Sequence, residues 1–280
     1  MRNLNGKHWY LYGYAGLYLI FNLIPFIALA FVSFGTSSFV LFPMEEFSTE
    51  FYTQAFQSGT IHTTAMTSFK IAIFVTIISM IVGFFGALAF ARYRWRFRSV
   101  FQKFILLPIF FPQAVLGLAL SLWFNTLNID QSWQTAMLAH LVWITPIATL
   151  IAAIPAYSFD ANLEDAAFDL GATRFQVFRE ITLPLLWPGV VAAGMFAFLL
   201  SWGNFALSLY TDGVDQTLPQ YLFSRMTQGY TPVVPAVAVM AAGLSILVIG
   251  AMLLISWMVR VYRQRRSVSN LVEFAPEAAP

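Results

Sequence analysis

The chain contains no cysteine, and only 10% of its 280 residues are charged, against about 25% in an ordinary soluble domain. The lack of cysteine excludes a small secreted domain held together by disulfides. The lack of charge, together with 59% apolar residues, excludes a water-soluble globular domain and a disordered chain. The composition therefore indicates an integral membrane protein, and the net charge of +2 is too small to indicate nucleic acid as a partner.

Sequence motifs for catalysis are missing as well. The chain has no G-x-x-x-x-G-K-[ST], H-E-x-x-H or G-x-S-x-G pattern. Its three histidines, His8, His62 and His140, fall in regions too far apart to share a metal ion. We therefore predict no catalytic residue, metal site or cofactor in this chain. A membrane protein of this kind is a channel, a transporter driven by an ion gradient, or one part of a machine powered by a separate subunit.

Six apolar segments are long enough to cross the membrane, since a helical span needs about 20 apolar residues. None shows the alternation of a membrane β-barrel strand. We predict an all-α integral membrane protein with six transmembrane helices, which are Tyr12–Phe34, Ile71–Ala91, Ile105–Phe124, Thr135–Ala156, Leu185–Leu209 and Pro235–Val259.

The basic residues predict the orientation of the spans. An even number of spans places both termini on one side, and thirteen of the fifteen Lys and Arg residues fall there. Arg225 lies on the opposite side, and Lys70 lies at the outer mouth of the second span. Because basic loops stay in the cytoplasm, both termini are predicted to be cytoplasmic. We expect the first span to remain uncleaved, since its apolar run is longer than that of a signal peptide.

The connection between the fourth and fifth spans, residues 157–184, is the only sizeable one on the inner side. Acidic residues open it, where they favour the amino end of a helix. Ala166 and Ala167 leave a bare face that another backbone can approach, and Gly171 permits a left-handed break. We therefore predict two short helices about a turn. The outer residues 35–67 are compatible with either a short amphipathic helix or an ordinary surface loop.

The inner connection resembles a known family. Asp165-Ala166-Ala167, Gly171, and then Ile181, Leu183 and Pro184 match the spacing E-A-A, three residues, G, nine residues, I-x-L-P. This spacing is the cytoplasmic signature of the permease subunits of binding-protein-dependent ATP-binding-cassette importers. The one departure is Asp165 for the usual Glu, and Glu164 beside it offers a replacement carboxylate.

Shorter segments are similar to the spermidine and putrescine permeases, namely residues 88–96, 107–108 and 217–219. The resemblance implies the type I importer permease fold in one domain, residues 1–280, with a short cytoplasmic tail from 260 to 280. It also implies a bacterial inner-membrane protein that pairs with a second, usually non-identical permease. Two ATPase subunits, which carry ATP and Mg, and an extracytoplasmic solute-binding protein complete the implied assembly.

The resemblance also implies a role for the inner connection. The first short helix, Glu164 to Gly171, would dock in a groove of the ATPase and couple ATP binding to movement of the spans. Arg174 and Arg179 would meet acidic groups or membrane phospholipid, or are solvated positive-inside charges.

Polar residues within the spans are candidates for lining the pathway. Asn204 offers a donor and an acceptor, which serve either the pathway or a hydrogen bond between helices, and the neighbouring Trp202 offers an aromatic face to a cation. Gln113 and His140 either line the pathway or form hydrogen bonds between helices, and Lys70 either serves the pathway or reaches to the membrane interface.

The last five spans contain no Asp or Glu. A polyamine-like solute, another organic amine, a zwitterion and an anion are all compatible with such a pathway. The rival class is a secondary transporter driven by an ion gradient, which usually needs a carboxylate within the membrane.

Overall fold

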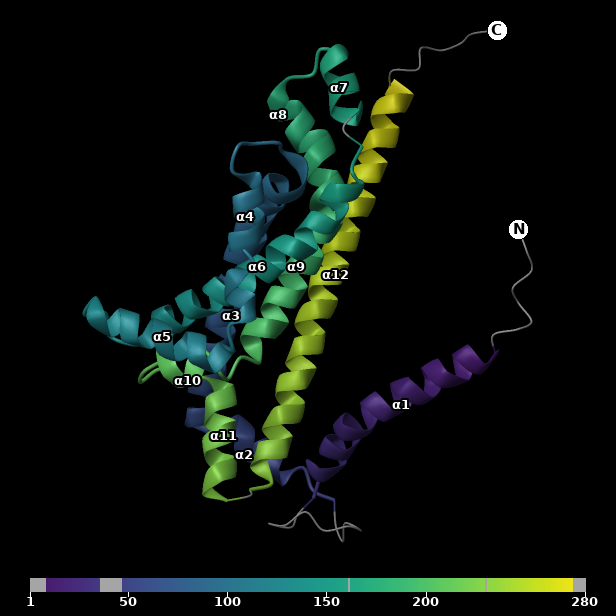
Figure 1. Ribbon diagram of the computed structural model, residues 1–280. Coiled ribbons are helices and arrows are strands. Elements are labelled where there is room, and N and C mark those ends of the chain that lie inside the picture. The colour runs from purple at the N-terminus through teal and green to yellow at the C-terminus, as the bar shows by residue number, and fades with distance from the viewer. Residues whose placement is uncertain (1–8, 36–46, 161, 230, 274–280) are drawn as a thin grey trace. The chain divides into compact units, whose positions relative to one another are not determined.

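A computed structural model of the chain describes residues 9–35, 47–160, 162–229 and 231–273. These residues are mostly helical (Figure 1). Among them, five helices are long and apolar enough to cross a membrane, which are α1 (Trp9–Val32), α3 (Gly59–Ala87) with the π-helical turn η1 (Leu88–Arg92), α6 (Trp133–Ser158), α9 (Leu183–Trp202) and α12 (Val233–Glu273). The basic residues Arg2 and Lys7, the acidic residues Glu45 and Glu46, and residues 274–280 lie outside the described ranges.

The remaining predicted span, Ile105–Phe124, is a bent pair of helices and not one straight helix. The first arm contains α4 (Arg98–Phe104) and the 3₁₀ turn η2 (Leu107–Phe110), and the second is α5 (Gln113–Thr126). The helix axis bends by 101° between the two arms. Pro112 has an extended ψ of 130° and no N–H to continue the helix, which explains the break. Taken as one span, the pair brings the total to six.

The chain divides into two compact units. Unit 1 comprises residues 1–62 and 221–244, and unit 2 comprises residues 63–220 and 245–280. Helices α3, α11 (Leu218–Gln228) and α12 each have residues in both units.

In unit 1, the outer connection contains a helix, α2 (Glu50–Gln57), so the helical alternative for this region is confirmed. The Tyr52 hydroxyl and the Ser33 hydroxyl are 2.6 Å apart, and the rings of Tyr52 and Phe34 are 5.2 Å apart. These contacts fix α2 against the end of α1.

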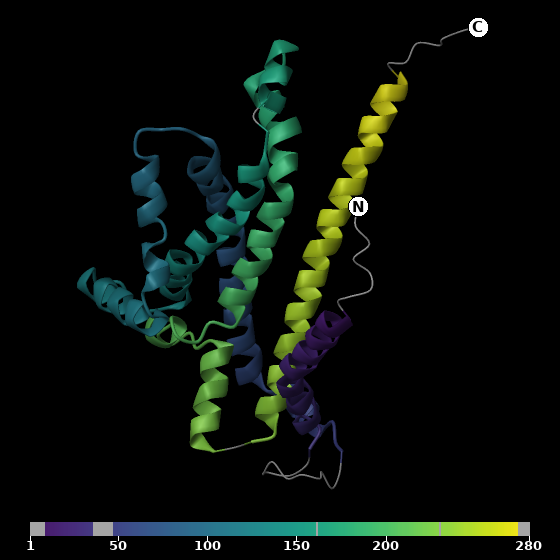
Figure 2. The same ribbon diagram turned by 45° about the vertical axis from the view of Figure 1, so that its right-hand side comes forward.

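In unit 2, α6 packs against α9 along its length, and the two helices lie side by side in both views (Figure 2). Small buried residues allow this approach, and they include Ala148, Ala152, Ala153 and Ala193. Helix α3 also approaches α6 closely at Gly86, because a Cβ atom on Gly86 would lie 2.9 Å from the Thr149 methyl group. Close packing of small residues is the usual way in which membrane helices associate.

Two spans end at other positions than the sequence predicts. Helix α9 stops at Trp202, because Asn204 accepts a hydrogen bond from the Leu207 N–H (3.0 Å) and begins a separate turn, α10 (Ser208–Thr211). Helix α12 continues past Val259 to Glu273, since no Gly or Pro interrupts residues 251–273.

The two ends of unit 2 correspond to the two predicted sides of the membrane. Helices α7 (Asn162–Asp169) and α8 (Arg174–Val177) lie near one end of α9, and α10 lies at the other (Figure 1). The basic turn after α3 meets the inner connection directly, because Arg92 contacts Glu164 at 2.8 Å. These two connections, predicted to share the cytoplasmic side, therefore do lie together.

Candidate functional site

The inner connection folds as two short helices about a turn, as predicted. Gly171 has a φ of +85°, and the Gly171 and Ala172 N–H groups donate to carbonyls of α7. Thr173 then caps α8, because its hydroxyl accepts from the Gln176 N–H (3.3 Å) while its own N–H donates to the Gln176 side chain (2.7 Å). A left-handed glycine followed by a capping box fixes the reversal of the chain locally.

Helix α7 presents an exposed face that combines apolar and acidic residues. We define the α7 face as Leu163, Asp165, Ala166, Asp169 and Leu170, all of which are exposed. Leu170 is 89% exposed, although it is a large apolar side chain. The spacing of these residues places them along one side of the helix, with the small Ala166 near its middle. Exposed apolar surface rimmed by polar groups is typical of a protein–protein contact.

Glu164 points away from the α7 face and makes internal contacts. One carboxylate oxygen lies 2.8 Å from the Arg92 guanidinium, and the other accepts a hydrogen bond from the Thr182 hydroxyl at 2.6 Å. The sequence indicated neither partner, because Arg92 looked like an ordinary positive-inside charge and Thr182 like a spacer in the motif. Asp165, in contrast, is exposed on the α7 face.

The other motif residues occupy two different settings. Arg174 begins α8 and is exposed, and Arg179 is exposed on the π-helical turn η3 (Phe178–Thr182). Ile181, Leu183 and Pro184 lie half-buried where η3 joins α9, and Leu183 packs against the cluster that contains Phe84 and Leu88. The second half of the motif therefore anchors the connection to the spans.

The intramembrane polar residues form a buried network at the break between α9 and α10. His140 is 1% exposed, and its ring nitrogens lie 2.9 Å from the Ser201 hydroxyl and 3.0 Å from the Ser208 hydroxyl. Asn204 is 5% exposed and donates to the Gln113 side chain at 3.4 Å. These contacts support the interhelical alternative for His140 and Gln113, and a role in the pathway stays a prediction.

The two remaining candidates, Trp202 and Lys70, each contact an aromatic ring. Trp202 is buried and stacks on Phe198, with ring centroids 6.2 Å apart. The Lys70 ammonium lies 3.7 Å from the centre of the Trp133 ring. The cation therefore rests on an aromatic face, which is a favourable site for an ammonium group. Helix α3 begins at Gly59 and not near the predicted Ile71, so Lys70 lies within the helix and not at its outer mouth.

A buried carboxyl group that the sequence analysis missed lies after α10. Asp212 is 1% exposed and accepts a hydrogen bond from the Thr217 N–H at 3.1 Å. Burial raises the pKa of the Asp212 carboxyl to about 6. Its neighbour Asp215 accepts from the Trp133 N–H (3.0 Å) at the start of α6. Asp212 thus holds a turn within the last outer connection of unit 2, and Asp215 joins that connection to α6.

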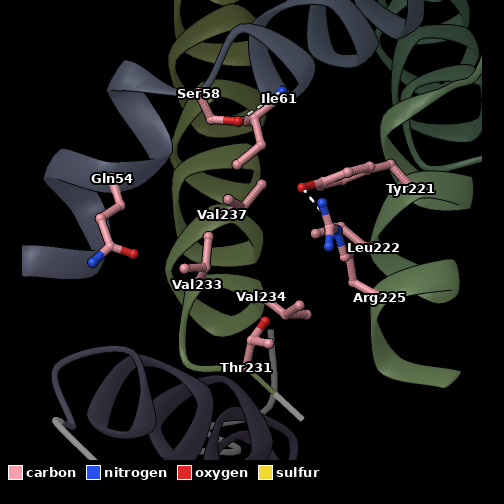
Figure 3. Close-up of a pocket in the computed structure, with 10 residues that line it drawn as sticks. All are labelled: Gln54, Ser58, Ile61, Tyr221, Leu222, Arg225, Thr231, Val233, Val234 and Val237. Carbon is pink, nitrogen blue, oxygen red and sulfur yellow. Dashed lines mark hydrogen bonds between the residues drawn. The ribbon is translucent and has the colours of Figure 1, made fainter. Parts of the chain in front are cut away.

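Unit 1 contains an open cavity of about 240 Å³ near Arg225 (Figure 3). The Arg225 Nε donates to the Tyr221 hydroxyl at 3.1 Å, and the guanidinium lies over the Tyr221 ring. The other lining residues are mainly apolar and neutral polar, and include Gln54, Ser58, Thr231 and Val237. The cavity thus combines one positive group with an apolar wall.

The membrane-length helices and the helical inner connection define a multi-span membrane protein. Over residues 79–268 the chain matches the family described as binding-protein-dependent transport system inner membrane component. The chain belongs to this family, and the predicted family, the helical membrane class and the importer permease fold are confirmed.

Similar proteins include polyamine permeases. The spermidine/putrescine transport system permease protein PotC of Haemophilus influenzae is 31% identical over 234 residues, which cover 83% of this chain and 89% of PotC. The putrescine permease PotI of Escherichia coli is 29% identical over 255 residues, 88% of this chain and 89% of PotI. A bacterial alginate ABC transporter, solved with its alginate-bound periplasmic protein, has a TM-score of 0.63 at 14% identity, and the match covers 89% of this chain and 93% of that one.

Proposed function

We propose that this chain forms half of the translocation pathway of an ATP-driven importer in the inner membrane of a bacterium. The domain 1–280 pairs with a second, non-identical permease subunit. It binds ATPase subunits, which hold ATP and Mg, on the cytoplasmic side. The observation that carries the proposal is the α7 face, which stands exposed at the inner end of unit 2.

The residues of the α7 face indicate which side chains a matching groove on the ATPase would carry. Leu163 and Leu170 flank Ala166 on one side, and Asp165 and Asp169 flank it on the other. A complementary groove has an apolar floor that accepts the leucines and basic side chains that pair with the aspartates. Closure of the ATPase pair around ATP then displaces α7, and the spans follow as rigid helices.

The outer side of the chain is acidic apart from one residue. Apart from Lys70 within α3, Arg225 is the single Lys or Arg on the predicted outer side. The acidic residues on that side are Glu45, Glu46, Glu50, Asp130, Asp212 and Asp215. We assign the Arg225 cavity to an acidic side chain of the extracytoplasmic solute-binding protein, because no other basic group in this outer part of the chain offers charge complementarity.

The substrate proposed is a polyamine-like or other organic amine. The printed names of PotC and PotI supply the polyamine, and the acidic outer side supports a cation by raising its local concentration. The lack of Asp and Glu in the last five spans means that dipoles and aromatic faces, and not carboxylates, would stabilise an amine within the membrane.

Copurification tests the coupling part of the proposal. Ala166→Arg places a long cation at the middle of the α7 face, and we expect it to abolish recovery of the ATPase with the permease. The matched control is Glu180→Arg, because Glu180 is exposed on η3 and lies outside the face. Recovery of the ATPase with Ala166→Arg at the native level would contradict the docking assignment.

A further inference from the structure

Helix α7 has no buried side chain of its own. It enters from the end of α6 and leaves through the turn at Gly171, where the space around the α-carbon is open. A short helix without an apolar anchor is marginal in water, because the gain from propensity is small. Polar contacts must therefore set its position relative to the spans.

Those contacts converge on Glu164. Its carboxylate binds the Arg92 guanidinium with one oxygen and the Thr182 hydroxyl with the other. The Arg92 guanidinium also lies over the Phe159 ring, 4.5 Å from its centre. Among the side chains that the structure describes, Arg92 and Glu164 form the one ion pair closer than 4 Å.

Both partners of Glu164 lie on π-helical turns. Arg92 is the last residue of η1, which ends the long helix from α3, and Thr182 is the last residue of η3, which leads into α9. π-helical turns within α-helices are uncommon and frequently mark functional positions. Here, the Glu164 carboxylate connects both irregular turns to α7, and through them it connects α7 to the two membrane helices α3 and α9.

We propose that Glu164 is the positioning residue that transmits movement of α7 to α3 and α9. This inference rests on the proposed function, in which α7 contacts the ATPase. The Glu164 joint, defined as Glu164, Arg92 and Thr182, makes α7 and the inner ends of both helices move as one body. Asp165 is exposed on the α7 face. The two neighbouring carboxylates therefore have separate tasks: Asp165 contacts the ATPase, and Glu164 transmits the movement.

The side chains of Arg92 and Glu164 are 16% and 15% exposed, so their charges are only partly hydrated. Charge-assisted hydrogen bonds in such a setting are stronger than those at an open surface. Loss of the Glu164 charge leaves the guanidinium without its counter-charge and releases α7 from both turns.

The first experiment measures coupling in vesicles that contain the complete importer. In Glu164→Gln we expect the ATPase to remain bound while the ATP hydrolysed per solute imported rises about tenfold, since the docking face is intact but the link to the spans is loosened. The matched controls are Glu180→Gln and Arg94→Gln, both at exposed positions on the same side. The exchange Arg92→Glu with Glu164→Arg restores coupling relative to either single change.

A second experiment reports on the joint without any ATPase. Because the chain has no cysteine, spin labels can be attached at Leu170→Cys, directly after α7, and at Val100→Cys on α4, both exposed in unit 2. We expect a narrow distribution of distances between the labels in the native chain and a broad one in Glu164→Gln. A narrow distribution in both, together with unchanged coupling, would overturn the inference while leaving docking intact. Failure of the native chain to bind any ATPase would instead overturn the proposed function.

Discussion

Replacement of Gly171 tests whether the left-handed turn sets the position of α7. Gly171 has a φ of +85°, and a Cβ atom placed on it would meet nothing within 4 Å. A substitution is therefore penalised by backbone strain alone, without a steric clash. Valine is strained in this region by about 1–3 kcal/mol, whereas asparagine is penalised less because it adopts left-handed backbone more readily.

This strain converts into a measurable change in binding. A strain of about 1.4 kcal/mol corresponds to a tenfold change, so relaxation of the turn lowers the docking-competent fraction of α7 by about tenfold. The apparent Kd of purified ATPase for the reconstituted permease rises by the same factor in Gly171→Val and by less in Gly171→Asn. Gly229→Val is the control, because Gly229 also has a positive φ (+134°) and open surroundings but lies far along the chain in the last outer connection. Equal Kd values for the two Gly171 variants would refute the reasoning.

Three further predictions concern the membrane interior and the outer side. The pKa of Asp212 in the folded chain, about 6, lies above its ordinary value of 3.8, so the folded chain binds this proton more tightly than the unfolded chain. Its stability therefore rises as the pH falls from about 7 to about 4. Protection of residues 212–220 from hydrogen exchange should rise over the same pH range, and should no longer depend on pH in this way in Asp212→Asn. Asn204→Leu leaves the Leu207 N–H unpaired and should lower stability by about 1–3 kcal/mol in thermal unfolding, whereas loss of uptake at native stability would indicate a pathway role. Arg225→Glu should slow association of the solute-binding protein, measured against salt concentration, and Arg225→Lys should largely preserve it; equal rates would remove Arg225 from that interface.

Local signals explain why the inner connection could be predicted from sequence. A glycine after a short acidic helix and a Thr-x-x-Gln cap each act within four residues, and they produce the turn at Gly171 and the start of α8 whatever surrounds them. The motif spacing likewise identified the residues that join η3 to α9. Segments of apolar composition identified the spans for the same reason, since the length needed to cross the membrane is a local property.

Contacts between distant segments could not be predicted. Arg92 and Glu164 are 72 residues apart, so no local pattern distinguishes Glu164, which turns inward, from Asp165, which remains exposed. The bend of the third span depends on how its two arms pack, although Pro112 marks its place. For Asn204 the sequence left a pathway role and a hydrogen bond between helices open, and it could not identify the partners that the chain supplies at the helix break.

Uptake by reconstituted vesicles tests the central claim, ATP-driven import coupled through α7, most directly. The vesicles contain the permease pair, the ATPase and the solute-binding protein, and labelled putrescine is supplied outside with ATP inside. We predict uptake that requires ATP, persists when an uncoupler collapses the ion gradients, and disappears with Ala166→Arg. Uptake by the permease without the ATPase, driven by an ion gradient and abolished by the uncoupler, would contradict the account and identify a secondary transporter.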